Sequence, residues 1–184
     1  MKIISRLMLD VLLLEPSKKS EEGVHTMVIS KSDLTKVGIN SEFVQENESF
    51  SYKNVLRGLH YQITHPQGKL IRVVSGSIFD AVVDMRRSSP FFGKSACFSL
   101  SDENGLMAWI PPGYAHGFYV SSDYAKIIYN VTDFWVQESE RTLLWSDKVL
   151  GIEWPIGENS PLISEKDANG HLFQDFKDEI IFNK

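Results

Sequence analysis

Short apolar runs alternate with polar turns between residues 55 and 135, and this pattern predicts β-structure. The turns hold residues typical of tight reversals, such as Asn104-Gly105 and Pro111-Pro112-Gly113. Strand-length runs at intervals of about 8–12 residues, without a long helical period between them, indicate an all-β sandwich or barrel. The expected strands cover residues 55–62, 69–74, 77–85, 95–100, 106–111, 116–121 and 125–135.

The two ends of the chain carry weaker patterns. A strand is expected at residues 9–15, where a proline ends it, and a polar loop at 17–23. The tail, residues 171–184, repeats apolar side chains at roughly helical spacing, which predicts a short amphipathic helix. We therefore expect one all-β domain over residues 1–184, with its core at about 9–170 and short peripheral helices. Further expected elements are an edge strand at 24–30, a short helix at 32–38 and a strand at 43–49.

Composition narrows the class of protein. Hydrophobic residues make up 42% of the 184 residues, which is enough for a packed core. The net charge of −5 argues against a nucleic-acid-binding surface, which is usually basic. Cys97 is the one cysteine, so the sequence offers neither an internal disulfide nor a cysteine metal cluster. No apolar run reaches membrane-spanning length and no secretory signal is recognisable, so we expect a soluble cytoplasmic protein.

The strand expected at the start of the β-region carries unusual side chains. In an extended strand His60 and Gln62 share one face, and Arg57 points to the other. Lys69 and Arg72 are cations within the next apolar run. Charged groups among strand residues need partners or a polar ligand, so this part of the chain predicts a site for an anionic molecule.

A further histidine follows a proline–glycine turn. The spacing from Gly105 through Pro111 and Gly113 to His116 resembles the second sequence motif of the cupin superfamily, which would point this histidine into a barrel. Metal-binding cupins also need two closely spaced histidines and a glutamate, whereas here His60 and His65 are separated by four residues and the glutamate is missing. We therefore expect a cupin-type jelly-roll barrel without a metal.

Other candidates allow two interpretations each. Tyr129 is either a core aromatic or a proton donor, and Trp135 would share its face if one strand held both residues. Asp80 and Asp84 also share a face; Asp84 is either the carboxylate of a dyad or a solvated strand end. Asp167 lies in a charged stretch, and the pattern alone does not assign it.

Eight segments, taken together and in order, resemble the dTDP-4-dehydrorhamnose 3,5-epimerase family. The resemblance covers about residues 9–170, and several long motifs in register are far more specific than any one of them. The matching segments are 43–47, 55–62, 67–72, 83–86, 89–93, 110–118, 151–155 and 164–167, and they include Arg57-Gly58-Leu59-His60 and Pro111-Pro112-Gly113-Tyr114-Ala115-His116.

The resemblance implies a metal-free barrel, usually a homodimer, that inverts C3 and C5 of a nucleoside-diphosphate 4-keto-6-deoxyhexose through an enolate without a cofactor. It implies that His60 is the base, Asp167 its partner, Lys69 the group beside the enolate oxygen and Tyr129 the proton donor on the opposite face. It further implies a set of substrate-binding residues: Arg57, Gln45, Asn47, Arg72, His116, Trp135 and Lys166.

Three alternative functions remain open at this level. A mono-epimerase would act at C3 or C5 only, a 3,4-ketoisomerase would move the ketone, and a non-catalytic module would only bind the sugar nucleotide. The nucleotide is also open, because family members carry an Arg-Gly-x-Phe-x-Glu-like segment where this chain has Glu22-Gly23-Val24-His25-Thr26-Met27.

Overall fold

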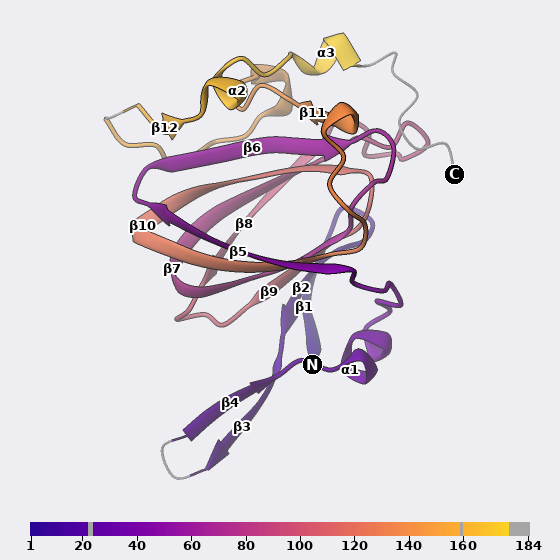
Figure 1. Ribbon diagram of the computed structural model, residues 1–184, viewed down its shortest axis with the longest axis vertical. Helices are drawn as coiled ribbons and strands as arrows, with labels where there is room; N and C mark the ends of the chain where they lie inside the picture. The colour runs from indigo at the N-terminus through magenta and orange to yellow at the C-terminus, as the bar shows by residue number, and fades with distance from the viewer. Residues whose placement is uncertain (22–23, 159, 177–184) are drawn as a thin grey trace.

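The computed structural model describes residues 1–21, 24–158 and 160–176, and in them the chain forms a mostly antiparallel β-barrel with short helices (Figure 1). This confirms the predicted all-β class. The strands are β1 Lys2–Leu7, β2 Val11–Glu15, β3 Ser17–Glu21, β4 Val24–Val28, β5 Gln45–Tyr52, β6 Val55–Gln62, β7 Lys69–Asp84, β8 Ser95–Ser101, β9 Met107–Ile110, β10 Tyr114–Val131, β11 Glu140–Thr142 and β12 Leu162–Ile163. The helices are α1 Lys31–Lys36, α2 Glu165–Ala168 and α3 Phe173–Phe176, with 3-10 turns at Gln137–Ser139 and Lys148–Leu150.

Two long strands replace four of the predicted ones. The runs at 69–74 and 77–85 form the single strand β7, and the runs at 116–121 and 125–135 merge into β10, which ends at Val131. The polar interruptions bend these strands without ending them. Gly76 takes a φ of +82°, and a Cβ there would lie 2.0 Å from the carbonyl oxygen of Tyr124. The pairing of the two strands is irregular at the same place.

The bends allow each long strand to take part in two layers of the barrel. The first half of β10 lies between β7 and β6, and its second half lies between β7 and β5. In the same way, β7 pairs with β9 near its start and with β8 near its end. The path of the main sheet runs β1-β2-β9-β7-β10-β6-β11. The bent strands thus enclose an interior.

Side chains alternate between this interior and the outer faces of the strands. The largest cluster of buried apolar residues fills the interior, and it includes Ile71, Val82 and Ile127. A second cluster packs the outer face of β6 against the chain beyond β11, and a third packs β2 and β9 against α1. Figure 1 shows this later part of the chain, with α2 and α3, lying over β6.

The N-terminal region differs from the expected loop. Residues 17–21 form β3, which pairs with β4 in a two-stranded sheet, and this hairpin projects from the barrel (Figure 1). The prediction of a loop was wrong for 17–21 because the run Ser17-Lys18-Lys19-Ser20-Glu21 contains no apolar residue, and alternation of apolar residues is what identifies a strand in a sequence. The rest of that loop, 22–23, lies outside the described residues.

The predicted short helices are present with altered ends. Helix α1 begins one residue earlier than expected, and its N-cap is Ser30, whose hydroxyl accepts the N–H of Asp33 at 3.1 Å. The tail helix α3 ends at Phe176, and the rest of the predicted tail, 177–184, lies outside the described residues. Within the described residues, no helix has the length and apolar character to cross a lipid bilayer.

Candidate active site

A bulge in β6 places Arg57 and His60 on the same side of the strand. His116 of β10 lies opposite His60, and Phe118 lies opposite Arg57, so β6 has one more residue than β10 over this stretch. An extra residue reverses the alternation of side chains. The predicted opposite faces were therefore wrong, because a regular strand was assumed, and both side chains line one cavity inside the barrel.

Two glycines allow β6 and β10 to approach each other beside these histidines. A Cβ on Gly58 would lie 2.5 Å from the Cα of Gly117, and a Cβ on Gly117 would lie 2.6 Å from the carbonyl oxygen of Arg57. Any side chain at either position would push the strands apart. The two glycines, one in each matching motif, thus hold His60 and His116 at neighbouring positions.

The cavity gathers five of the residues singled out from the sequence. They lie on β6, β7 and β10, and apolar side chains of the same strands complete the walls. A second hollow adjoins it and shares His60, Lys69 and Tyr129 with it. The five residues of the inner cavity are Arg57, His60, Lys69, His116 and Tyr129, and the adjoining hollow adds Gln45, Asn47, Gln62 and Trp135.

His60 and Asp167 form a close pair. The imidazole Nε2 lies 2.5 Å from the Asp167 carboxylate, which is only 2% exposed. Asp167 is held in α2, where Ser164 caps the helix and accepts the Asp167 N–H. Its carboxylate also accepts the N–H of Gly58 at 3.3 Å. Burial would raise the pKa of Asp167, but the hydrogen bonds from His60 and from these backbone and side-chain groups lower it overall, so the group is a carboxylate.

Lys69 is a cation in a sheltered position. Burial lowers the pKa of its ammonium to about 8, although the carboxylates of Asp80 and Glu140 act in the opposite direction. At neutral pH the side chain is still mainly charged. It therefore supplies a weakly solvated positive charge on the wall that it shares with His60 and Tyr129.

Asp80 is an interior carboxylate to which the sequence pattern assigned no role. It is fully buried in β7, and its Oδ1 lies 2.9 Å from Nε2 of His116. Burial lowers the pKa of His116 despite this carboxylate, so its imidazole is neutral at pH 7. The sequence did hold one signal that Asp80 is buried: it shares a strand face with Val82, which belongs to the apolar core.

Asp84, the other candidate of that strand, belongs to a structural network instead. Arg86 donates to Asp84 from Nη2 at 2.7 Å and to Asp10 from Nη1 at 2.8 Å. Tyr114 donates to the same Asp10. Asp84 is fully buried, so the solvated strand end considered for it is wrong. Its carboxylate has a cationic partner, as the dyad interpretation required, but that partner is the guanidinium of Arg86 and the pair does not line the cavity.

Tyr129 presents a phenol to the cavity from the second half of β10. It lies between Asn47 of β5 and Ile71 of β7 in the sheet. Burial raises the pKa of its hydroxyl, and the positive charge of Arg57 opposes that rise. The phenol is therefore protonated at neutral pH and can give up a proton.

The mouth of the site is built from loops and exposed side chains. Trp135 lies beyond the end of β10, so the assumption that it shares a strand with Tyr129 was wrong, yet the two residues line the same hollow. Gln45 and Asn47 of β5 also line that hollow, and Gln45 donates to Asn47 at 2.6 Å. Lys166 donates to Glu140 at 2.9 Å and borders a further hollow next to Trp135.

Arg72 does not join the other residues. It alternates with Ile71, which lines the cavity, and shares the outer face of β7 with Leu70, which packs in the cluster next to α1. His65 also lies outside the cavity, with Nδ1 at 3.3 Å from Asp133. In the described part of the chain, no three His, Cys, Asp or Glu side chains come together as a metal-ligand set.

Comparison with known proteins gives one consistent result. The family model described as dTDP-4-dehydrorhamnose 3,5-epimerase matches residues 7–175. A dTDP-4-dehydrorhamnose 3,5-epimerase from Shigella flexneri is 47% identical over 95% of this chain and 97% of its own length. One from Pseudomonas aeruginosa is 53% identical over 72% of this chain and 73% of its own length.

A solved structure gives the same result for the fold. An epimerase from Legionella pneumophila, crystallised with dTDP-4-keto-L-rhamnose, superposes with a TM-score of 0.91 at 40% identity, over 100% of this chain and 98% of that one. This likeness supports the predicted cupin-type barrel. The match of the family model over nearly the whole chain, together with these identities, shows that the chain belongs to the dTDP-4-dehydrorhamnose 3,5-epimerase family.

Proposed function

We propose that this protein inverts C3 and C5 of dTDP-4-dehydro-6-deoxyglucose to give dTDP-4-dehydrorhamnose, without a cofactor. Membership of the family supports this activity. The single observation in this chain that carries it is the His60–Asp167 pair in a cavity that also holds Lys69 and Tyr129. Such a cavity combines a base, a cation and a proton donor, which are the groups that inversion next to a ketone requires.

His60 is the base of the proposed mechanism. The hydrogens on C3 and C5 are weakly acidic because the C4 ketone can take up the charge as an enolate. His60 removes such a hydrogen as a proton and becomes an imidazolium. Asp167 orients the ring through Nε2, which leaves Nδ1 for the substrate, and its negative charge stabilises the imidazolium.

Lys69 stabilises the intermediate. When the proton leaves carbon, negative charge moves to the C4 oxygen. An ammonium beside that oxygen interacts more strongly with the enolate than with the ketone, so it lowers the barrier to proton removal and does more than strengthen binding. The partial burial of Lys69 strengthens this interaction, because less water screens the charge.

Tyr129 completes the inversion. A proton delivered to the face opposite His60 reverses the configuration of the carbon, and a neutral phenol can deliver it. The phenol becomes a phenolate in this step, and the charge of Arg57 stabilises that anion. Exchange with solvent then returns the proton to Tyr129 and removes the one on His60, so the enzyme ends each inversion as it began.

The remaining residues bind the substrate. Arg57 and His116 line the inner cavity and would contact the sugar or the diphosphate. Lys166 and Trp135 lie at the mouth, where they would contact the nucleotide, together with Gln45 and Asn47. Arg72 has no part in this proposal, because it lies on the outer face of β7.

The family resemblance further supports a homodimer, and the substrate supports a cytoplasmic location, since nucleotide sugars are made from nucleoside triphosphates. Light scattering after size-exclusion chromatography tests the first: a mass near twice 20.9 kDa is expected, and a single-chain mass contradicts it.

Deuterium uptake tests the function. The protein is incubated in heavy water with dTDP-4-dehydro-6-deoxyglucose, and NMR spectroscopy locates the label. We expect deuterium at both C3 and C5 of the product. Uptake at one carbon only would make the protein a mono-epimerase, a product with its ketone at C3 would make it a ketoisomerase, and binding without uptake would make it a binding module.

A further inference from the structure

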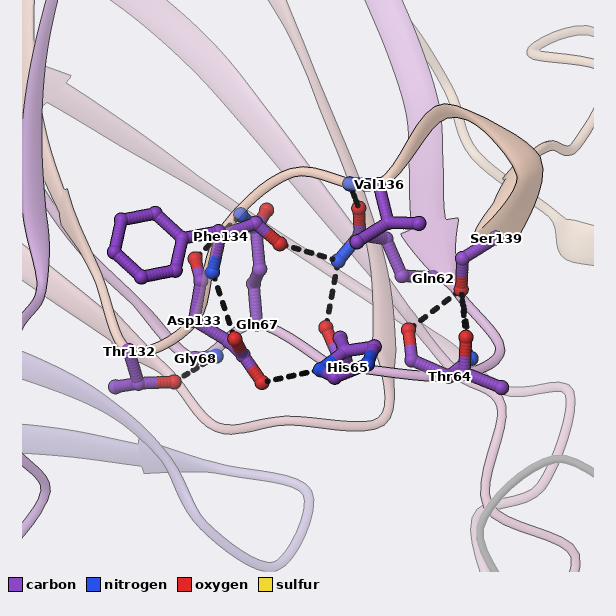
Figure 2. Close-up of polar contacts among 10 residues, drawn as sticks. All are labelled: Gln62, Thr64, His65, Gln67, Gly68, Thr132, Asp133, Phe134, Val136 and Ser139. Atoms are coloured by element: carbon purple, nitrogen blue, oxygen red, sulfur yellow. Dashed lines mark hydrogen bonds and ion pairs between the residues drawn. The ribbon is translucent and has the colours of Figure 1, made fainter.

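Gln62 is a buried polar residue that the proposed mechanism does not use. It lies two residues after His60 on β6 and is only 4% exposed. Its side-chain amide makes three hydrogen bonds, all to backbone groups of two loops (Figure 2). Nε2 donates to the carbonyl oxygen of His65 at 2.6 Å and to that of Phe134 at 3.2 Å, and Oε1 accepts the N–H of Val136 at 2.6 Å.

Two of these bonds flank Trp135. The carbonyl of Phe134 and the N–H of Val136 belong to the two peptide groups on either side of the tryptophan. Both are held by one amide, and that amide is tied to the first loop through His65. Gln62 thus holds the backbone on either side of Trp135, while Trp135 itself is 55% exposed at the mouth of the site.

The neighbouring bonds extend this connection along the loop. Gln67 donates to the carbonyl of Asp133 at 2.8 Å, and the N–H of Gly68 donates to the hydroxyl of Thr132 at 2.8 Å. Thr132 returns a backbone N–H to Gly68 at 3.1 Å. Figure 2 shows the two loops side by side with these side chains between them. The loop that follows β10 is therefore attached to the loop that follows β6, and Gln62 makes the contacts next to Trp135.

We propose that Gln62 is a positioning residue that holds Trp135 ready to stack on the nucleotide base, and that it thereby sets the affinity for the nucleotide. This inference rests on the proposed function, because it takes a dTDP-sugar as the substrate. A flat surface that is already in place loses little conformational freedom when the base binds. A tryptophan on an unanchored loop would lose conformational freedom when the base binds, and this entropy cost would weaken binding.

The test compares nucleotide binding and turnover in matched variants. Gln62→Met keeps the length of the side chain and removes all three hydrogen bonds. We expect the Kd for free dTDP and the KM for the dTDP-sugar to rise about tenfold, which is the order of magnitude of one base–aromatic stack, while kcat changes less than about twofold. Gln67→Met is the matched control. Gln67 lines the same hollow, but its one bond to this loop, to Asp133, does not involve the peptide groups next to Trp135, so its effect should be smaller.

A double-mutant cycle separates positioning from a general structural role. Trp135→Ala alone should weaken dTDP binding as much as Gln62→Met does. Adding Gln62→Met to Trp135→Ala should then change the Kd for dTDP by less than about twofold, because the residue through which Gln62 acts is gone. Equal losses from Gln62→Met with and without Trp135 would overturn the inference, as would a wild-type Kd in Gln62→Met.

Two further measurements keep the outcome clear. Circular dichroism and thermal melting establish that each variant is folded, and Gln62→Glu, which retains the acceptor for Val136, replaces Gln62→Met if that variant does not fold. Quenching of Trp135 fluorescence by dTDP needs no turnover. If dTDP quenches the fluorescence of the wild type but no deuterium is taken up, the proposed reaction is contradicted and this inference stands. If the wild type takes up deuterium but Gln62→Met binds dTDP as tightly as the wild type, the proposed reaction stands and this inference is overturned.

Discussion

The inner cavity and the mouth of the site are built from different kinds of structure. In the cavity, His60, Lys69 and Tyr129 lie on β6, β7 and β10, whose backbones are paired along the sheet. At the mouth, Trp135 and Lys166 are exposed and lie outside the long strands. Gln62 bonds to the backbone on either side of Trp135, and Lys166 lies in the short helix α2. Groups that move protons need fixed geometry, whereas groups that recognise a ligand can lie on loops. Substitutions of His60, Lys69 or Tyr129 in the cavity should therefore lower kcat, and that of Trp135 at the mouth should raise KM.

The largest expected effect is on the base. His60→Ala should lower kcat about 10³–10⁴-fold with little change in KM, because a general base contributes to the barrier and not to ground-state binding. Deuterium exchange at C3 and C5 measures the rate directly. A variant that keeps kcat within tenfold of the wild type would show that another group removes the proton.

Lys69 should show a smaller loss and a characteristic pH dependence. Lys69→Met should lower kcat about 10²–10³-fold, since it removes the cation beside the developing oxyanion. In the wild type, the ammonium is charged below its pKa of about 8 and neutral above it, so kcat/KM should fall as pH rises through about 8.

Steady-state rates from pH 6 to pH 10 measure this limb, and the limb should be absent in Lys69→Met. A wild-type profile that stays flat up to pH 10 would mean that no group with this pKa carries the enolate charge.

Asp167 acts through His60, so its effect should be smaller again. Asp167→Asn should lower kcat about 10–10²-fold and should leave dTDP binding unchanged, because the amide cannot stabilise the imidazolium. The pKa of Asp167 is lowered in the folded protein, so its stabilising effect is complete above the ordinary value of 3.8 and is lost as pH falls below it.

Melting curves between pH 3 and pH 7 check this second part. The difference in melting temperature between the wild type and Asp167→Asn should shrink at the acid end. A difference that stays constant over the whole range would place the effect of Asp167 elsewhere than in its charge.

The smallest expected effect lies at the mouth. Trp135→Ala should raise KM about tenfold and leave kcat nearly unchanged, because the lost base stacking affects substrate and transition state alike. Steady-state kinetics with the dTDP-sugar measure both constants. A loss in kcat as large as that of Asp167→Asn would remove the distinction between cavity and mouth.

The sequence predicted the residues that line the cavity more fully than the contacts that hold those residues in place. The alternation of side chains and the turn residues indicated the barrel, and the residues that line it matched family motifs. Arg57 was placed on the wrong face because a bulge in β6 cannot be read from alternation alone. Arg72 was grouped with Lys69 by type, although three residues of separation on a strand put the two on opposite faces.

Tertiary contacts account for what the sequence left out. Asp80 contacts His116, which lies 36 positions later on the neighbouring strand. Gln62 bonds to a loop more than seventy positions away. The bends at Gly76 and around 121–124 could not be distinguished from strand ends, because polar residues occur at both. The pairing of Asp167 with His60 was implied by the family resemblance alone, because no local sequence pattern shows that α2 packs against β6.

The central claim is that His60 and Tyr129 act on opposite faces of one bound keto sugar. It is tested most directly by Tyr129→Phe in heavy water with dTDP-4-dehydro-6-deoxyglucose. The account predicts that the variant still exchanges the hydrogen that His60 removes and returns it to the same face, so that deuterium enters the recovered substrate with its configuration retained. Inverted product formed by Tyr129→Phe at the wild-type rate would contradict the account.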